Sequence, residues 1–139
     1  MNASTFYRIA AVLLVLFALG HTLGFRRSDP NLLGSMRLTR FDVQGFNHTY
    51  WDLIVAAGFS VGVFYLFAAI VAWQLGALPA PTLALMRGTV WASSLCLAAL
   101  AVVSWRYLLI LPIAFSILIT LCLIAAAWFS GKQVPVPPS

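Results

Sequence analysis

Apolar residues run along this chain in four long stretches, separated by short groups of polar residues, glycine and proline. A helix needs about 20 mostly apolar residues to cross the hydrocarbon core of a bilayer. The four stretches predict membrane-spanning helices at about residues 6–25, 51–75, 82–104 and 107–129. We therefore expect an all-α membrane protein, in which residues 1–131 form a single four-helix transmembrane bundle with up-down topology.

The residues between the stretches support these boundaries. Gly76 followed by Pro79 ends the second helix, because glycine favours a helix end and proline cannot continue the helix. Trp105-Arg106 leaves room only for a tight turn, so the third and fourth helices should form an antiparallel hairpin. The Pro-rich tail, residues 132–139, is expected to be disordered.

The one long connection, residues 26–50, is polar but patterned. Asp29 followed by Pro30 is a helix-start signal, since it places a capping residue before proline at the first helical position. After it, Leu32, Leu33 and Met36 recur at helical spacing. This pattern predicts a short amphipathic helix that lies in the membrane interface between the first two spanning helices.

Composition excludes a soluble domain. The chain of 139 residues is 63% hydrophobic and 8% charged, whereas soluble domains carry about 25% charged residues. The bases stand singly at the ends of apolar segments, which suits contact with lipid phosphates and not with nucleic acid. Cys96 and Cys122 lie inside apolar runs and are expected to be packing residues.

Charged and titratable residues gather at one membrane face, and a functional site is expected to open there. Both histidines, all three acids and five of the eight bases belong to this face. An ionisable residue inside a membrane helix is a functional candidate because its burial is costly. His21 is such a residue, about one turn inside the end of the first helix.

We expect three candidate catalytic residues, His21, Asp52 and Asp42. A carboxylate that orients an imidazole is a common acid–base arrangement, and Asp52 at the start of the second helix could orient His21. Asp52 has a structural alternative, because Thr49-Tyr50-Trp51-Asp52 matches a capping box. Asp42 also has one, a surface ion pair with Arg40 or Arg26.

Further residues are candidates for ligand binding or helix packing. Basic and aromatic side chains at the same face could contact an anionic or polar group of a ligand: Arg26, Arg37, Arg40, His48, Tyr50 and Arg106. Two pairs of glycines at four-residue spacing are typical of close helix packing in lipid: Gly20 and Gly24, Gly58 and Gly62. No metal site and no cofactor are expected, and b-type haem held by His21 and His48 is disfavoured.

The chain resembles an uncharacterised family of short bacterial integral membrane proteins with four helices. The resemblance lies in the stretches Leu19-Gly20-His21-Thr22-Leu23-Gly24-Phe25, Arg40-Phe41-Asp42-Val43-Gln44-Gly45 and Thr49-Tyr50-Trp51-Asp52, and it covers about the first 75 residues. More loosely, the layout is similar to that of DoxX-like membrane proteins. The resemblance implies a multi-pass protein of the bacterial inner membrane, and it implies no activity.

Three functions fit these observations. The leading hypothesis is a membrane protein that binds an amphiphilic, lipid-like ligand (a quinone, sterol or isoprenoid) between the first two helices. The second is a small membrane enzyme of the isomerase or cyclase type, with a His-Asp acid–base pair. The third is a non-catalytic subunit, in which the glycine faces contact a membrane partner or a second copy. The expected partners are therefore lipid, a small amphiphile or another membrane chain.

Overall fold

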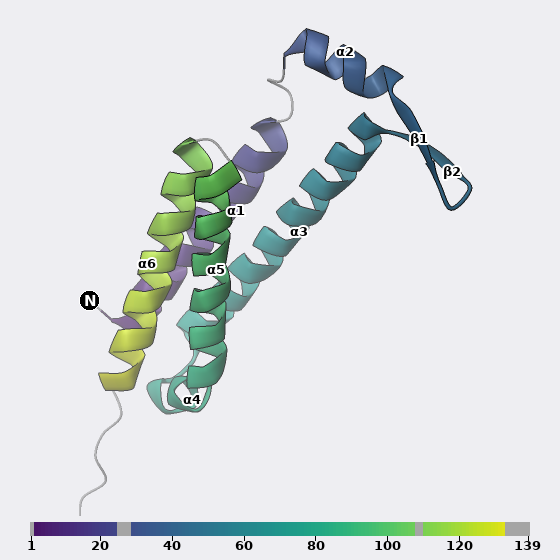
Figure 1. Ribbon diagram of the computed structural model, residues 1–139. Coiled ribbons are helices and arrows are strands. Elements are labelled where there is room, and N and C mark those ends of the chain that lie inside the picture. The colour runs from purple at the N-terminus through teal and green to yellow at the C-terminus, as the bar shows by residue number, and fades with distance from the viewer. Residues whose placement is uncertain (1, 25–28, 108–109, 133–139) are drawn as a thin grey trace, which may run out of the picture.

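The computed structural model describes residues 2–24, 29–107 and 110–132, and it is almost entirely helical (Figure 1). The elements in chain order are α1 (Ala3–Gly24), α2 (Pro30–Leu38), β1 (Arg40–Val43), β2 (Phe46–Thr49), α3 (Tyr50–Ala77), α4 (Ala80–Leu85), α5 (Arg87–Tyr107) and α6 (Ile110–Lys132). In the described chain, four helices are long and apolar enough to cross a membrane: α1, α3, α5 and α6. The predicted all-α four-helix membrane bundle is therefore confirmed.

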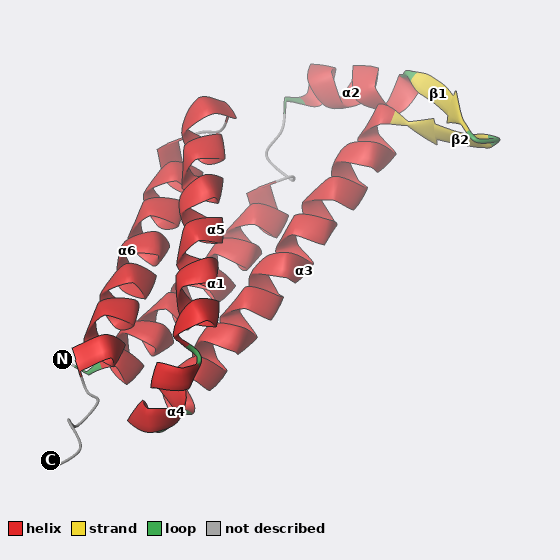
Figure 2. Cartoon of the chain, turned by 60° about the horizontal axis from the view of Figure 1, so that its bottom comes forward, coloured by secondary structure: helices red, strands yellow, loops and turns green. Residues whose placement is uncertain are grey.

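The bundle is built around α1, which packs against both α3 and α6, while α5 packs against α6 (Figure 2). Ring stacking joins α1 to α6 at both ends of the contact, through Phe6 with Phe129 and Phe17 with Phe115. We call the side where α1 and α5 end and α3 and α6 begin the loop face, and the other side the α4 face. Each helix thus runs antiparallel to the neighbours against which it packs.

α1 and α3 make a close contact near the α4 face. A Cβ placed on Gly76 would lie 3.1 Å from Tyr7 Cβ and 3.2 Å from the carbonyl oxygen of Ser4. The hydroxyl of Ser4 donates a hydrogen bond to the carbonyl of Gly76. Small residues let helix backbones approach in lipid, and a polar contact such as this one stabilises the pair.

The third predicted helix, expected at 82–104, is divided in two. Pro79 and Pro81 favour a new helix start just after α3, because proline suits the first turn of a helix, and α4 begins there. A turn at Met86 then separates α4 from the spanning helix α5. The first and last spans match their predicted ranges within three residues at each end, and α3 extends to Ala77.

The long connection contains the predicted helix and an unpredicted hairpin. Asp29 caps α2 by accepting a hydrogen bond from the backbone N–H of Asn31 at 2.8 Å, which confirms the expected helix start. Beyond α2, β1 and β2 pair antiparallel. Gln44 and Gly45 join them with φ of 56° and 83°. Positive φ at both central residues is typical of the tight turns that close two-residue hairpins.

Candidate functional site: a cleft between α3 and α5

His21 lies on α1 within a small group of aromatic rings. Its ring centroid is 6.4 Å from that of Tyr65 on α3 and 6.5 Å from that of Phe17. Phe17 in turn packs edge-on against Tyr65 at 4.6 Å. The side chain of His21 is half-buried. The structure therefore places His21 inside the helix bundle, on the side of α1 that faces α3.

Asp52 is not close to His21. On α3, the residues that face the end of α1 are Tyr65, beside His21, and Gly62, whose added Cβ would lie 3.4 Å from Thr22 Oγ1. Asp52 is ten residues before Gly62, so the helical rise places it about 15 Å further toward the loop face. The expected acid–base pair between these two residues is therefore not formed.

The hydrogen bonds of Asp52 instead form a capping box. Its carboxylate accepts from the backbone N–H of Thr49 at 2.9 Å and from the Thr49 hydroxyl at 2.7 Å. The backbone N–H of Asp52 donates back to Thr49 Oγ1 at 3.2 Å. This reciprocal pattern satisfies two otherwise unpaired donors at the start of α3. The structural alternative for Asp52 accounts for these contacts fully.

Asp42 is part of the hairpin turn. Its carboxylate accepts a hydrogen bond from the backbone N–H of Gly45 at 3.2 Å. Arg40, one of its two expected ion-pair partners, donates to the side-chain oxygen of Asn47 at 3.3 Å. The other expected partner, Arg26, lies outside the described residues. The observed role of Asp42 is thus to stabilise the turn between β1 and β2.

The remaining predicted ligand-binding residues are spread over the loop face. Arg37 on α2 stacks over the ring of Trp51, with its guanidinium carbon 5.2 Å from the ring centroid. Tyr50 packs against Phe41, and His48 stacks on Phe46 at 6.1 Å within the hairpin. Arg106 is exposed near the end of α5. Arg37, Tyr50 and His48 thus lie around the hairpin and the start of α3, whereas Arg106 lies on another helix.

The predicted packing glycines divide between the two helices. Gly58 and Gly62 are buried on α3. On α1, by contrast, a Cβ added to Gly20 or Gly24 would meet no atom within 4 Å in the described part of the chain. Gly62 lies against α1, since an added Cβ would be 3.4 Å from Thr22 Oγ1. Gly76, which the spacing of glycines did not indicate, lies closer still to α1.

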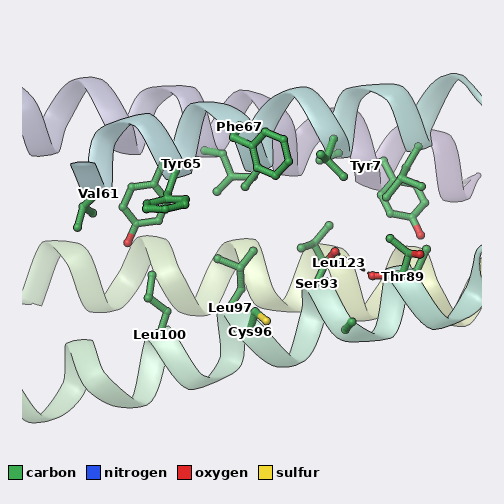
Figure 3. Close-up of a pocket in the computed structure, with 18 residues that line it drawn as sticks. Tyr7, Val61, Tyr65, Phe67, Thr89, Ser93, Cys96, Leu97, Leu100 and Leu123 are labelled. Carbon is green, nitrogen blue, oxygen red and sulfur yellow. Dashed lines mark hydrogen bonds between the residues drawn. The ribbon is translucent and has the colours of Figure 1, made fainter. Parts of the chain in front are cut away.

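A cavity of about 470 Å³ lies between α3 and α5 (Figure 3). In the described chain these two helices do not pack along each other. Side chains of α3 and α5 form its walls, with Tyr7 and Leu14 of α1 and Leu123 of α6 behind them. The cavity reaches from Val61 to Leu75 on α3, which corresponds to about 21 Å of helix.

The lining of this α3–α5 cleft is apolar, with a few uncharged polar groups. Those groups belong to Tyr7, Tyr65, Thr89, Ser93 and Cys96, and no charged residue of the described chain lines the cleft. Ser93 uses its hydroxyl to donate to the carbonyl of Thr89 at 2.9 Å. Tyr7 and Tyr65 lie at opposite ends of the cleft, and the hydroxyl of Tyr65 points away from α3 across the gap (Figure 3).

A second, smaller cavity lies between α1 and α3, where the sequence predicted the ligand. Its volume is about 200 Å³, and Thr22, Phe59 and Gly62 are among its lining residues. The α3–α5 cleft is more than twice as large. The charged residues predicted a ligand site between the first two spanning helices, α1 and α3. The larger of the two cavities lies instead between α3 and α5, and no described residue that lines it is charged.

No metal centre is indicated in residues 2–24, 29–107 and 110–132, because they contain no cluster of three or more His, Cys, Asp or Glu side chains suited to a metal ion. The chemistry available in the α3–α5 cleft is therefore hydrogen bonding by tyrosine, threonine and serine hydroxyls within an apolar wall. Comparisons of the chain with protein-family models, with curated proteins and with solved structures found no match.

Proposed function

We propose that this membrane protein binds one lipid-like amphiphile, of the quinone, sterol or isoprenoid class, in the cleft between α3 and α5. The observation that carries the proposal is the cavity of about 470 Å³, which falls within the size range of about 300–1,000 Å³ typical of small-molecule sites. Such sites are mostly apolar with a few well-placed polar groups, and the cleft has this composition.

The polarity of the lining favours an uncharged polar group on the ligand. Burial of a charge without a partner is strongly unfavourable, and among the residues that the structure describes no charged side chain lines the cleft. A carbonyl or hydroxyl could instead accept a hydrogen bond from Tyr65 at the end nearer the loop face. Quinones, sterols and isoprenoid alcohols carry such groups on a hydrocarbon body.

The test is mass spectrometry of lipids extracted from the detergent-purified protein, compared between two variants of α5. Cys96→Phe places a ring inside the cleft, whereas Leu95→Phe adds a similar ring at a neighbouring position that is 67% exposed and outside the cleft lining. We expect a single species to be retained by the wild type and by Leu95→Phe and to be lost from Cys96→Phe. Equal retention by both variants would contradict the proposal.

A third variant, Tyr65→Phe, tests the polar contact alone. It keeps the ring and removes the hydroxyl, so the packing against Phe17 is preserved. Loss of one hydrogen bond weakens binding by about 0.5–1.5 kcal/mol, or up to about tenfold. Unchanged retention would show that the ligand is held by its hydrocarbon part only.

We further propose that the membrane is the inner membrane of a bacterium. This location rests on the resemblance of the first 75 residues to short bacterial membrane proteins, together with the four spanning helices. Separation of inner and outer membranes on a density gradient, followed by detection of the protein, is the direct test. Recovery in the outer-membrane fraction would contradict it.

A further inference from the structure

The β-hairpin between α2 and α3 has two chemically different faces. Alternate residues of a strand point to opposite sides of the sheet, and the register pairs Phe41 with His48 and Val43 with Phe46. These four side chains therefore share one face, which we call the hairpin apolar face. The opposite face carries the other two cross-strand pairs, Arg40 with Thr49 and Asp42 with Asn47.

The outer half of the hairpin apolar face has no cover within the described chain. Val43 is 53% exposed and Phe46 is 65% exposed, next to the turn. The inner half is partly covered, since Phe41 packs on Tyr50 with ring centroids 5.2 Å apart. An isolated two-stranded hairpin is at best marginally stable in water, so contact with another apolar surface would stabilise this one.

The position of the hairpin supplies such a surface. β2 ends at Thr49, and the spanning helix α3 begins at the next residue. Tyr50 and Trp51 are of the two residue types that concentrate at the membrane–water interface. The hairpin points sideways, away from the other spanning helices, and lies at the level of the first turns of α3 (Figure 1). It is therefore held at the depth where headgroups meet acyl chains.

We propose that the hairpin apolar face rests in the interfacial layer of the bilayer, with Val43 and Phe46 in contact with lipid acyl chains. The face is too small for a stable protein interface, which uses about 20–30 residues on each side. The polar face carries one base and one acid, Arg40 and Asp42, so its charges balance. Contact with lipid should therefore depend on apolar burial and not on the charge of the headgroups.

The experiment labels single cysteines on the two hairpin faces with the fluorophore NBD. The full chain, with Cys96→Ser and Cys122→Ala as background, is reconstituted in phosphatidylcholine vesicles. Phe46→Cys reports on the apolar face and its sequence neighbour Asn47→Cys on the polar face. Quenching is measured with lipids that carry a doxyl group on the acyl chain, and with iodide present on both sides of the membrane.

We expect doxyl lipids to quench the label at 46 at least twofold more than the label at 47, and iodide to show the reverse order. The pattern should persist when a third of the lipid is phosphatidylglycerol. Val43→Cys provides a second reporter on the same face if substitution of Phe46 prevents folding. Equal iodide quenching at 46 and 47 would overturn the proposal. So would protection of 43 and 46 from both quenchers, which would indicate a protein cover such as a second copy.

Discussion

The close contact between α1 and α3 at Gly76 gives a quantitative test of how these two helices are held together. The perturbation is Gly76→Ala. The added Cβ would lie 3.1 Å from Tyr7 Cβ and 3.2 Å from the Ser4 carbonyl oxygen. Unstrained contacts between carbon atoms are about 3.5–4.0 Å. Neither neighbouring atom can rotate away, because one is backbone and the other is attached directly to it, so α1 itself must shift.

The expected loss of stability follows from this overlap. Overpacking by one methyl group costs about 1–3 kcal/mol. Alanine in place of glycine in a helix returns about 0.5–1 kcal/mol, so the net destabilisation should be about 1 kcal/mol. Gly20→Ala is the matched control, because a Cβ there meets no described atom within 4 Å. The stabilisation of a helix by alanine in place of glycine is then about equal in the two variants. Their free energies of unfolding should therefore differ by about 1–3 kcal/mol.

The assay is equilibrium unfolding of the reconstituted protein in mixed micelles of increasing dodecyl sulfate content, followed by circular dichroism. We expect the midpoint for Gly76→Ala to fall below that of the wild type, and that for Gly20→Ala to stay level or rise. If Gly76→Ala is as stable as Gly20→Ala, the close approach of α1 and α3 at this point is not a packing constraint and the reasoning fails.

Two further predictions concern stability. Thr49→Val keeps the shape of the cap residue but removes the hydroxyl that pairs with Asp52. The free energy of unfolding should therefore fall by about 0.5–2 kcal/mol, while lipid retention stays unchanged. Loss of the bound lipid would instead indicate a functional role for the Thr49–Asp52 pair. Phe17→Leu removes the ring contacts with Tyr65, Phe115 and His21, and should lower stability by about 1–3 kcal/mol in the same unfolding assay. An unchanged midpoint would show that these contacts add nothing beyond apolar packing.

The spanning helices were predictable because the bilayer imposes a length and a polarity on each of them. Every backbone group in lipid must be paired within its own helix, so long apolar stretches leave little choice. The capping residues Asp29 and Thr49 were predictable for a similar reason, since their hydrogen bonds depend only on residues within three positions.

The hairpin was not predicted because its sequence signal is short. Each strand has four residues, and alternation over four positions is weak evidence for a strand. The turn residues are Gln44 and Gly45, whereas the strongest hairpin signal is Asn or Asp before glycine. The helical spacing of Leu32, Leu33 and Met36 correctly predicted a helix at α2. This pattern ends before β1 and therefore did not indicate the hairpin.

The α3–α5 cleft was not predicted because the sequence interpretation followed charge. Ionisable residues such as Asp42 and Asp52 have local structural roles in the turn and the cap. The α3–α5 cleft depends on which helices are neighbours, and that order is a tertiary property. A sequence signal did exist in Tyr65, a polar group in the middle of an apolar span, but it was weak beside the charges of the loop face.

The cleft exists because helices in lipid are drawn together by close packing and polar contacts, and not by the exclusion of water. α1 buries small residues, namely Ala10, Ala11 and Ala18, which allow close packing against its neighbours. The side of α3 that lines the cleft has large residues, among them Phe64 and Phe67. Phe64 and Phe67 are 72% and 63% exposed, so these rings do not close the gap between α3 and α5.

An apolar gap in a bilayer can be filled by any acyl chain, so cavity volume alone does not distinguish a specific ligand from bulk lipid. The hydroxyl of Tyr65 does distinguish a specific ligand from bulk lipid, because an acyl chain offers this hydroxyl no hydrogen-bond partner. If Cys96→Phe displaces a lipid and Tyr65→Phe does not, the cleft is a solvation site for ordinary lipid. If both variants lose the same species, the cleft recognises a polar group, and binding of that molecule is the function to pursue.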